Sequence, residues 1–496
     1  MKISALEDRL ADYGSGGYYL LETFVLELLR LEAGVNKQEL QVNSRRSHAP
    51  LDAFAPKGIG DIHTPLSIEV IFILSPNRLR DIAEVHRKFK KSEVEGLLIV
   101  TLRQMAKGTD YVEKIVQSSS SKIYIWDQDK LQLLVDRHKD AAERILENLF
   151  SIHLKKAVNG SLEDWRKKRD GIISHVIEKF KNGRLSLFLG AGVSSSAGLP
   201  NWDVLLNRLF VSMLTESDQG ADGAENEKIN SIVSRLRQID GPSTITLARY
   251  IRKGMSSALS AERNKFIDSV TKQLYGLRDR RFSISSELIK EIVNMCTPLR
   301  SGAKVRGVVT YNFDDLLEKV LVDREIAHRS IFEEEDLADP EELPVYHVHG
   351  FLPENRSEYA NLDRSTLVFS EEGYHQIYRD AYHWSNLIQL NWLKETSCLM
   401  IGLSLTDPNL RRLLEISTKS VDKPRHFAFM KRTGYDEFAN KGANPVLKAP
   451  AQMVRKFLDR HHNLNEEVLR ELGVTIIWYE SHDEIPGIIK RIRKSL

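Results

Sequence analysis

The sequence predicts an α/β fold with two domains, the larger of which is built on a Rossmann-like parallel sheet. Short apolar runs, typical of buried strands, alternate with segments whose apolar residues recur at helical spacing. One such run, residues 185–189, leads directly into the turn Gly190-Ala191-Gly192, after which a helix is expected. The length of 496 residues is sufficient for roughly two to four domains, each with its own core.

Residues 1–155 are expected to form the smaller domain, which is also α/β. Residues 18–33 have an apolar face at helical spacing and are predicted to form an amphipathic helix. Strand-like runs follow at 66–71, 96–101 and 122–126, and helical patterns cover 78–89 and 128–149. A polar segment around 157–165 is predicted to be the linker to the second domain.

Residues 165–496 are expected to form the larger domain. A helix at 171–181 precedes the strand at 185–189, and further strand-like runs lie at 306–310, 345–349, 398–401, 426–430 and 474–479. Helical patterns lie between most of these runs, which predicts a parallel sheet covered on both faces. Residues from 216 to about 300 carry no strand pattern and are predicted to be a helical insertion.

The composition is that of an ordinary globular protein, with 42% hydrophobic and 28% charged residues. A net charge of +2 gives no global electrostatic sign of nucleic-acid binding. The only cysteines, Cys296 and Cys398, exclude a disulfide framework and suit a reducing compartment. The first residues lack the apolar core of a signal peptide, and no apolar run approaches the roughly 18 residues needed to span a bilayer. We therefore expect a cytoplasmic protein without a membrane segment.

The glycine turn is the first candidate binding feature. Glycines after a buried strand let backbone N–H groups approach the phosphates of a dinucleotide, and the following helix N-terminus favours negative charge. The turn departs from the pattern G-x-G-x-x-G, because Ser195 stands at the third glycine position. Taken alone, the turn fits nucleotide binding and a purely structural connection equally well.

Three later strand ends also carry polar residues. One ends with Thr310, Asn312 and Asp314, the next with His349 and Gly350, and the third with Gly402, Ser404 and Asp407. Ligands of open parallel sheets bind beyond the carboxyl ends of the strands. We therefore expect these residues and the glycine turn to converge on one pocket.

In this region the chain resembles the sirtuin family. The matching motifs are Gly-Ala-Gly-x-Ser with Gly198-x-Pro200, Thr-x-Asn-x-Asp at 310–314, His349-Gly350 and Gly402-x-Ser404, in the family's order. The two Cys-x-x-Cys pairs of deacylating sirtuins are missing, so we expect no zinc there and disfavour a protein deacylase. The segments 370–374 and 403–407 look like those of bacterial sirtuin-like effectors, which hydrolyse NAD in defence against bacteriophage.

The resemblance implies that NAD is a substrate and that Asn312 and His349 are catalytic. Asn312 would orient a water or the ribose hydroxyls, and His349 would act as general base. His347 lies on the same strand face and competes for this role; only the family match selects His349. The residues expected to bind NAD are Gly190, Ala191, Gly192 and Ser194 at the pyrophosphate, Asp314 at the ribose hydroxyls or fixing Asn312, Gly402 and Ser404 at the adenosine half, and also Thr310 and Asp407. An aspartate before a proline often simply starts a helix after a strand, so Asp407 fits that interpretation as well.

The resulting expectation is an NAD+ hydrolase that releases nicotinamide and acts by NAD depletion, a form of abortive infection. Whether the product is linear or cyclic ADP-ribose stays open. The resemblance also implies a homo-oligomer, often beside an ATPase translocase or another defence protein. The main alternative is a module that senses NAD or ADP-ribose and regulates an N-terminal Mg²⁺-dependent nuclease.

Residues 1–155 resemble the restriction-endonuclease-like fold. The resemblance rests on a helix that carries Glu22, on Asp52, and on the strand of residues 67–71 with Glu69. Active members place a lysine two residues after the glutamate, where this chain has Ile71. We therefore expect a degenerate fold that binds DNA or a partner, and disfavour Mg²⁺ binding by Glu22, Asp52 and Glu69.

Overall fold

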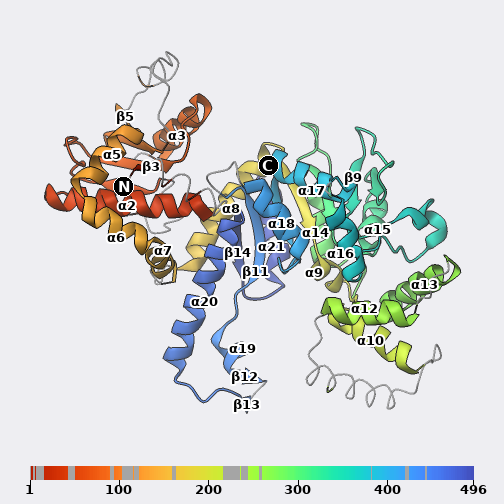
Figure 1. Ribbon diagram of the computed structural model, residues 1–496. Helices are drawn as coiled ribbons and strands as arrows, with labels where there is room; N and C mark the ends of the chain where they lie inside the picture. Colours follow the sequence, from red (N-terminus) through yellow and green to blue (C-terminus); the bar gives the residue numbers. More distant parts are fainter. Residues whose placement is uncertain are drawn as a thin grey trace. The chain divides into compact units, whose positions relative to one another are not determined.

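The computed structural model describes residues 2–3, 6, 10, 16–42, 51–89, 94–102, 116, 122–158, 164–215, 235, 244–255, 260–380, 382–418, 424–441 and 444–496. The chain divides into two compact units, and Figure 1 shows the course of the chain through both. Unit 1 comprises Met1–Ile172, Leu414–Arg425 and Arg432–Trp478, and unit 2 comprises Ile173–Leu413, His426–Lys431 and Tyr479–Leu496. Each unit therefore combines segments that are far apart in the sequence.

A five-stranded mixed sheet forms the centre of unit 1, with strands in the order β1-β2-β3-β4-β5. The pairs β1–β2 and β2–β3 are antiparallel, whereas β3, β4 and β5 run parallel. Every residue of β4 is buried, which explains its continuous apolar sequence. The bounds are β1 (Gln41–Val42), β2 (Ala53–Ala55), β3 (Leu66–Ile71), β4 (Gly96–Thr101) and β5 (Lys122–Trp126).

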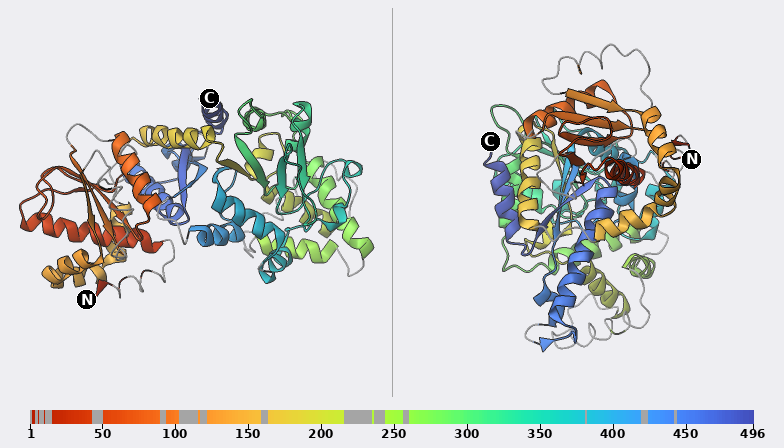
Figure 2. Two further views of the ribbon diagram at one scale, coloured as in Figure 1. Left: turned by 90° about the horizontal axis from the view of Figure 1, so that it is seen from above. Right: turned by 90° about the vertical axis from the view of Figure 1, so that its left-hand side faces the viewer.

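Helix α2 (Gly16–Val35) packs against this sheet and gives the core Phe24, Leu28 and Leu29, all fully buried (Figures 1 and 2). Helix α7 packs against both α2 and α20, so a helix late in the sequence belongs to the same unit as the N-terminal sheet. The helices of this unit are α3 (Pro76–Phe89), α5 (Gln128–Arg137), α6 (Lys139–Glu147), α7 (Leu149–Val158), α19 (Tyr435–Ala439) and α20 (Ala451–Glu471), with a small hairpin β12 (Asn440–Lys441) and β13 (Asn444–Pro445).

The second sheet has seven strands in the order β14-β11-β10-β6-β7-β9-β8. The pairs from β11 to β8 are all parallel, as the alternation of strands and helices predicted. All five residues of β6 and of β10 are buried, consistent with central strands covered on both faces. The bounds are β6 (Leu185–Leu189), β7 (Val305–Thr310), β8 (His328–Ile331), β9 (Leu343–His347), β10 (Ser397–Ile401), β11 (His426–Lys431) and β14 (Val474–Tyr479).

Helices connect these strands. Between β6 and β7 the described residues form helices and no strand, as predicted for the insertion at 216–300; most of residues 216–243 lie outside the described part. The helices are α8 (Trp165–Lys181), α9 (Ala191–Ser195), α10 (Trp202–Thr215), α12 (Thr244–Met255), α13 (Ser260–Gly276), α14 (Glu287–Cys296), α15 (Leu316–Asp323), α16 (Glu371–Arg379), α17 (Trp384–Glu395), α18 (Pro408–Thr418) and α21 (Glu484–Arg493), with short 3-10 turns η1 (Arg356–Glu358) and η2 (Leu362–Arg364).

Two predicted elements differ from the structure in a way that matters below. The helix predicted over 128–149 is broken, because His138 leaves helical geometry and its ring bonds the buried carboxylate of Glu32 at 2.8 Å. The strand predicted over 345–349 ends at His347, since β9 runs from Leu343 to His347. Consequently His349 lies beyond the strand and not within it.

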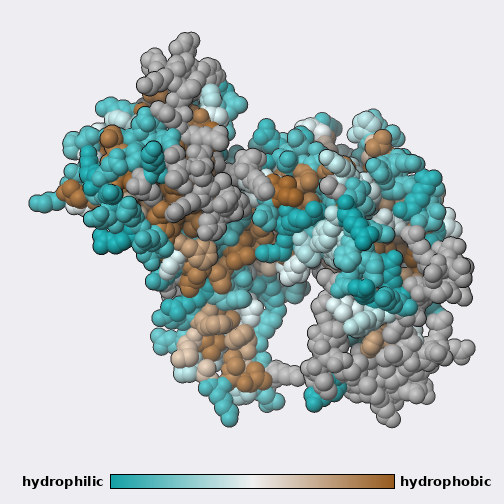
Figure 3. All heavy atoms as spheres, in the orientation of Figure 1, coloured by the Kyte–Doolittle hydropathy of each residue, from teal (hydrophilic) through white to brown (hydrophobic). Residues whose placement is uncertain are grey.

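Helix α20 has apolar side chains on an exposed face as well as on its packed one. Met453, Phe457, Leu464 and Val468 are exposed at helical spacing, and Figure 3 shows apolar surface gathered over α19 and α20. Within the described residues, no helix combines the length and apolar character required to cross a bilayer.

Candidate functional site

The glycine turn lies where the strand order of the large sheet reverses, since β6 is flanked by β10 on one side and by β7 on the other. Gly190 N donates to Ile401 O at 2.9 Å, and Gly192 N donates to Gly402 O at 3.0 Å. A Cβ atom on Gly192 would lie 2.8 Å from Gly402 Cα, and Gly402 itself has a φ of +69°. The loops after β6 and β10 therefore pack backbone to backbone, which only glycine permits here. Such a crevice at a reversal of strand order is the usual ligand site of open α/β sheets.

A second glycine fixes the segment after the turn. Gly198 has a φ of +90°, and a Cβ atom there would lie 2.4 Å from Asp279 O. Arg278 Nε donates to Ala197 O at 2.9 Å, and Asp279 N donates to Gly198 O at 2.8 Å. The basic segment around Arg278 thus holds the turn in place.

Asn312 connects the end of β7 to the glycine turn. Its Nδ2 donates to Ser194 Oγ at 2.8 Å and to Gly190 O at 3.1 Å. Thr310 Oγ1 accepts the backbone N–H of Asn312 at 3.1 Å, so the loop is braced at both ends. Because both amide hydrogens of Asn312 are engaged, its Oδ1 is the atom that can accept a hydrogen bond from water or a ribose hydroxyl.

Asp314 is buried close to the same serine. Burial raises the pKa of its carboxyl group to about 6, while hydrogen bonds from Ser194 and from the backbone N–H of Leu316 act in the opposite direction. The side chain is 7% exposed, so a charged carboxylate here is poorly solvated. Ser194 therefore links Asn312 and Asp314, two of the predicted site residues.

The structure separates the two histidines that the sequence left in competition. His347 is buried, and its Nε2 lies 2.7 Å from Glu318 Oε1 while its Nδ1 lies 3.2 Å from Asn312 O. Both ring nitrogens thus have protein partners, which gives His347 a structural role. His349 Nε2 is buried and makes no hydrogen bond among the described residues.

His349 faces Asp407 and Tyr374. Its Nε2 lies 3.7 Å from Asp407 Oδ2, and the Tyr374 hydroxyl donates to that same oxygen at 2.5 Å. Asp407 Oδ1 accepts the backbone N–H of Leu410, which fixes the carboxylate at the start of α18. Burial lowers the pKa of His349 below its usual value, and the negative charge of Asp407 opposes this shift only in part. A neutral imidazole beside a carboxylate is suited to accept a proton at neutral pH.

Asn312 and His349 occupy equivalent positions just beyond the ends of two neighbouring strands. Thr310 of β7 pairs with His347 of β9, and each catalytic candidate follows its strand's paired residue by two positions. The ring of Tyr311 packs edge-on against that of His349, with centroids 4.7 Å apart. The sheet register therefore brings the two loops together.

The remaining predicted residues are distributed around this crevice. Ala191, Gly192 and Ser404 are exposed, and Ser404 Oγ lies 2.7 Å from Thr406 Oγ1. Ser194, Thr310 and Asp314 are buried behind the turn. Asp407, which follows β10, lies beside His349. Sequence reasoning missed Glu318 and Tyr374, whose contacts with the site residues span 29 and 33 positions in the chain.

The three acidic residues considered for Mg²⁺ in the N-terminal part of the chain have other surroundings. Asp52 Oδ2 accepts the backbone N–H of Val70 at 2.7 Å, and Glu22 Oε2 lies 3.3 Å from Arg470 Nη2. Glu69 is buried in β3. Across the described ranges, these three residues do not gather into a group of candidate metal ligands. The restriction-endonuclease-like fold and its DNA or partner binding stay predictions.

Comparison with known proteins assigns a class to this site. The family model for the SIR2-like domain matches residues 306–448, which include the loops of Asn312, His349 and Gly402. The glycine turn precedes the matched residues. With the parallel sheet and the reversal of strand order at β6, this match confirms the expected likeness to sirtuin-like domains for that part of the chain.

A curated relative is more specific about chemistry. The chain is 20% identical over 328 residues to the NAD(+) hydrolase ThsA of Enterococcus faecium. The alignment covers 65% of this chain, and it spans 58% of the length of that relative. At the level of the family, the two similarities support a sirtuin-like, NAD-cleaving domain.

Proposed function

We propose that this protein is an NAD+ glycohydrolase that cleaves the bond between nicotinamide and ribose. The observation that carries the proposal is the arrangement around His349: a buried, neutral imidazole beside Asp407, two residues after its strand as Asn312 is after the neighbouring one. The likeness to ThsA and to SIR2-like domains supports the choice of NAD as substrate.

The residues suit the chemistry of this cleavage. The nicotinamide nitrogen leaves with the electron pair of the glycosidic bond, and C1′ of the ribose becomes oxocarbenium-like. Asn312 Oδ1 would accept a hydrogen bond from the attacking water, whose oxygen forms the new bond to C1′. His349 would take the proton of that water, and Asp407 would stabilise the resulting imidazolium. The products are nicotinamide, ADP-ribose and one proton.

Binding of the rest of NAD would use the crevice between the loops after β6 and β10. The amides of Gly190, Gly192 and Val193 donate within the chain, so they serve to shape the turn. The exposed Ala191 and Ser404 flank this packed centre and are our candidates for the pyrophosphate and the adenosine half. Asp314 would bind the ribose through Ser194 or directly.

We extend the proposal to a defence role, in which NAD depletion halts bacteriophage growth, because the sequence resembles bacterial sirtuin-like effectors and is similar to an NAD(+) hydrolase. Constant NAD hydrolysis would harm the host. We therefore propose a homo-oligomer that is activated on assembly or by a partner such as an ATPase translocase. Light scattering combined with NAD cleavage over a range of protein concentrations tests this: cleavage per chain should rise with assembly, and a fully active monomer contradicts it.

The decisive experiment follows free nicotinamide after purified protein is mixed with NAD. Asn312→Ala and His349→Ala are expected to lower the rate by about 10²-fold or more, the range of a general base and its oriented water. His375→Ala is the matched control, because His375 is exposed on α16 next to Tyr374 and is expected to leave the rate unchanged. If Asn312→Ala and His349→Ala release nicotinamide at the wild-type rate, the proposed catalytic roles of these two residues are wrong.

A pH profile tests the role of Asp407. The Asp407 charge raises the pKa of His349, so Asp407→Asn should shift the acidic limb of the rate profile to lower pH and slow the reaction. Wild-type protein that binds NAD but releases no nicotinamide, in monomeric and assembled forms and in infected-cell extract, would instead identify a sensing module.

A further inference from the structure

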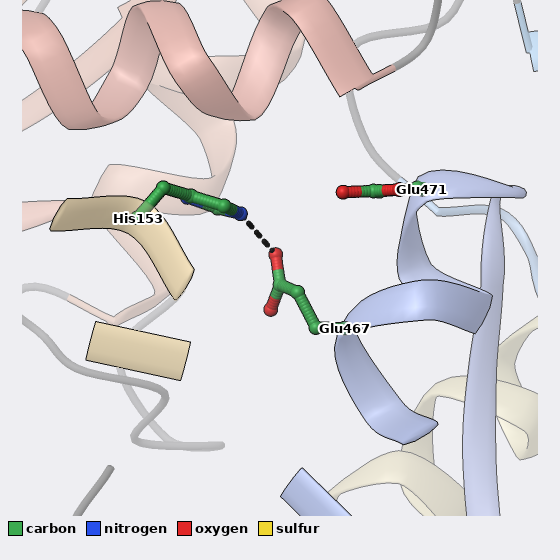
Figure 4. A group of neighbouring side chains, drawn as sticks. All are labelled: His153, Glu467 and Glu471. Carbon is green, nitrogen blue, oxygen red and sulfur yellow. Dashed lines mark ion pairs between the residues drawn. The ribbon is translucent and has the colours of Figure 1, made fainter. Parts of the chain in front are cut away.

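A cluster of polar side chains joins two helices of unit 1, remote in sequence from the sirtuin-like motifs. His153 of α7 lies between α2 and α20, and its Nε2 is 2.9 Å from Glu467 Oε1. Glu471 lies one helical turn beyond Glu467 on α20, and Figure 4 shows its carboxylate directed toward the same space. One ligand atom from each of the three residues lies within 4.8 Å of the other two.

The imidazole is fixed by a contact on its far side. His153 Nδ1 lies 2.9 Å from Thr23 Oγ1, and Thr23 is buried in α2. A ring that donates its Nδ1–H to a neighbouring hydroxyl presents the lone pair of Nε2, the form in which histidine binds a metal. A lone pair at 2.9 Å from a carboxylate oxygen is repulsive unless a proton or a cation lies between the two atoms.

The surrounding charges favour a cation. Glu467 and Glu471 are spaced i,i+4 on one helix, where like charges destabilise. Glu467 is buried, so its negative charge is poorly solvated. Arg470 is the neighbouring cation: it lies 3.3 Å from Glu22 and 4.0 Å from Glu467 Oε2, which leaves Glu467 Oε1 directed at His153.

We propose that His153, Glu467 and Glu471 bind a zinc-class divalent cation that fastens α7 to α20. One imidazole nitrogen and two carboxylate oxygens form a donor set that Zn²⁺ accepts, with water in the fourth tetrahedral position. Zinc ligands lie roughly 3 to 3.5 Å apart around the ion, given metal–ligand distances near 2 Å, so a small rotation of the Glu471 side chain completes the set. The site differs from the cysteine module of deacylating sirtuins, which this chain lacks.

Calorimetric titration of the chelator-treated full chain with Zn²⁺ tests the proposal. We expect about one ion per chain, and a melting temperature raised by about 3 °C or more under saturating Zn²⁺. His153→Ala and Glu471→Gln are expected to weaken binding at least tenfold and to abolish the rise. His461→Ala is the matched control, because this exposed histidine lies on α20 outside the cluster and its loss should change nothing.

The outcomes separate the cation from a plain ion pair. If wild-type protein takes up no Zn²⁺ at micromolar concentration, or if Glu471→Gln binds as tightly as wild type, the cluster is an ion pair and the proposal fails. An equal loss in His461→Ala means surface binding and also overturns it, as does equal binding of Mg²⁺. Circular dichroism establishes that each variant folds, and Glu471→Gln decides the question if His153→Ala does not.

Discussion

The carboxyl group of Asp314 lies in a buried place, where its negative charge is unfavourable. Its pKa rises to about 6 in the folded protein because the group is buried, against an ordinary value of 3.8. The folded state therefore binds this proton more tightly than the unfolded state does. The stabilisation from the protonated form is complete below pH 3.8 and is lost as the pH rises through about 6. At neutral pH the buried charge of Asp314, which lies beside Ser194, therefore lowers the free energy of unfolding.

Replacing this residue should reveal the conflict. Asp314→Asn is expected to raise the free energy of unfolding by about 1–2 kcal/mol at pH 7.5, because a shift of this size corresponds to at most roughly 3 kcal/mol. The gain should shrink as the pH falls from 6 toward 4, where wild type is protonated as well. Denaturant unfolding at several pH values measures this, with Asp323→Asn on the exposed side of α15 as control. A gain that does not vary with pH contradicts the buried charge as its cause.

At the scale of elements, two loops define the candidate site. The loops after β6 and β10 contact through Gly190, Gly192 and Gly402, so the glycines that suggested a nucleotide also have a packing reason. Glycine is required in either case, because the backbones of the two loops approach each other closely at the reversal of strand order, whether or not a nucleotide binds there. The sequence alone could not separate the two cases.

Two glycine-to-alanine substitutions separate the effect of close packing between the loops from that of helix propensity. Gly402→Ala places a Cβ atom 2.6 Å from Val193 N at a positive φ, and we expect a loss of about 2–3 kcal/mol of stability together with weakened NAD binding. Gly487→Ala, on the exposed side of α21 with no atom within 4 Å, should add up to about 1 kcal/mol. Thermal unfolding compares the two. Equal effects would show that the contact between the loops is not tight.

Prediction from sequence succeeded where elements are long or buried. Every residue of β4, β6 and β10 is buried, so the continuous apolar runs of these strands could be recognised from the sequence. It failed for β8, whose four residues lie at a sheet edge with three of them partly exposed and so carry no apolar run. In the site, the motif order predicted Asn312 and His349 as catalytic residues, and this stays a prediction. The partners that separate His347 from His349, Glu318 and Asp407, become neighbours only through the sheet register.

At the scale of the whole molecule, unit 1 is not complete in the first part of the chain. Helix α7 packs on α20, Arg470 contacts Glu22, and the Arg470 guanidinium lies 4.3 Å from the centre of the Tyr19 ring. The two contacts of Arg470 join residues more than 400 positions apart, as the 448 positions between Glu22 and Arg470 illustrate. A fragment that ends near the linker predicted around residues 157–165 would lack these contacts.

A fragment of residues 1–158 should therefore be less stable than the same residues in the full chain. We expect its melting temperature to lie about 10 °C or more below the transition of unit 1, and its α2 and α7 to be cleaved faster by protease. Adding a peptide of residues 451–471 should restore part of the protection, whereas the same peptide with Arg470→Ala should restore less. A fragment that melts at the temperature of the full chain would show that α20 adds no stability to unit 1.

The discontinuity of the units also sets the order in which they can be finished on the ribosome. Synthesis proceeds from the N-terminus, and unit 1 waits for Arg432–Trp478 until the loops that carry Asn312, His349 and Gly402 have been translated. Unit 2 in turn waits for α21, which packs on α14 and pairs Arg493 with Glu291. A chain interrupted before Val474 therefore lacks the closing pieces of both units. The nascent protein carries the loops of Asn312, His349 and Gly402 long before it carries the elements that complete the folds around them.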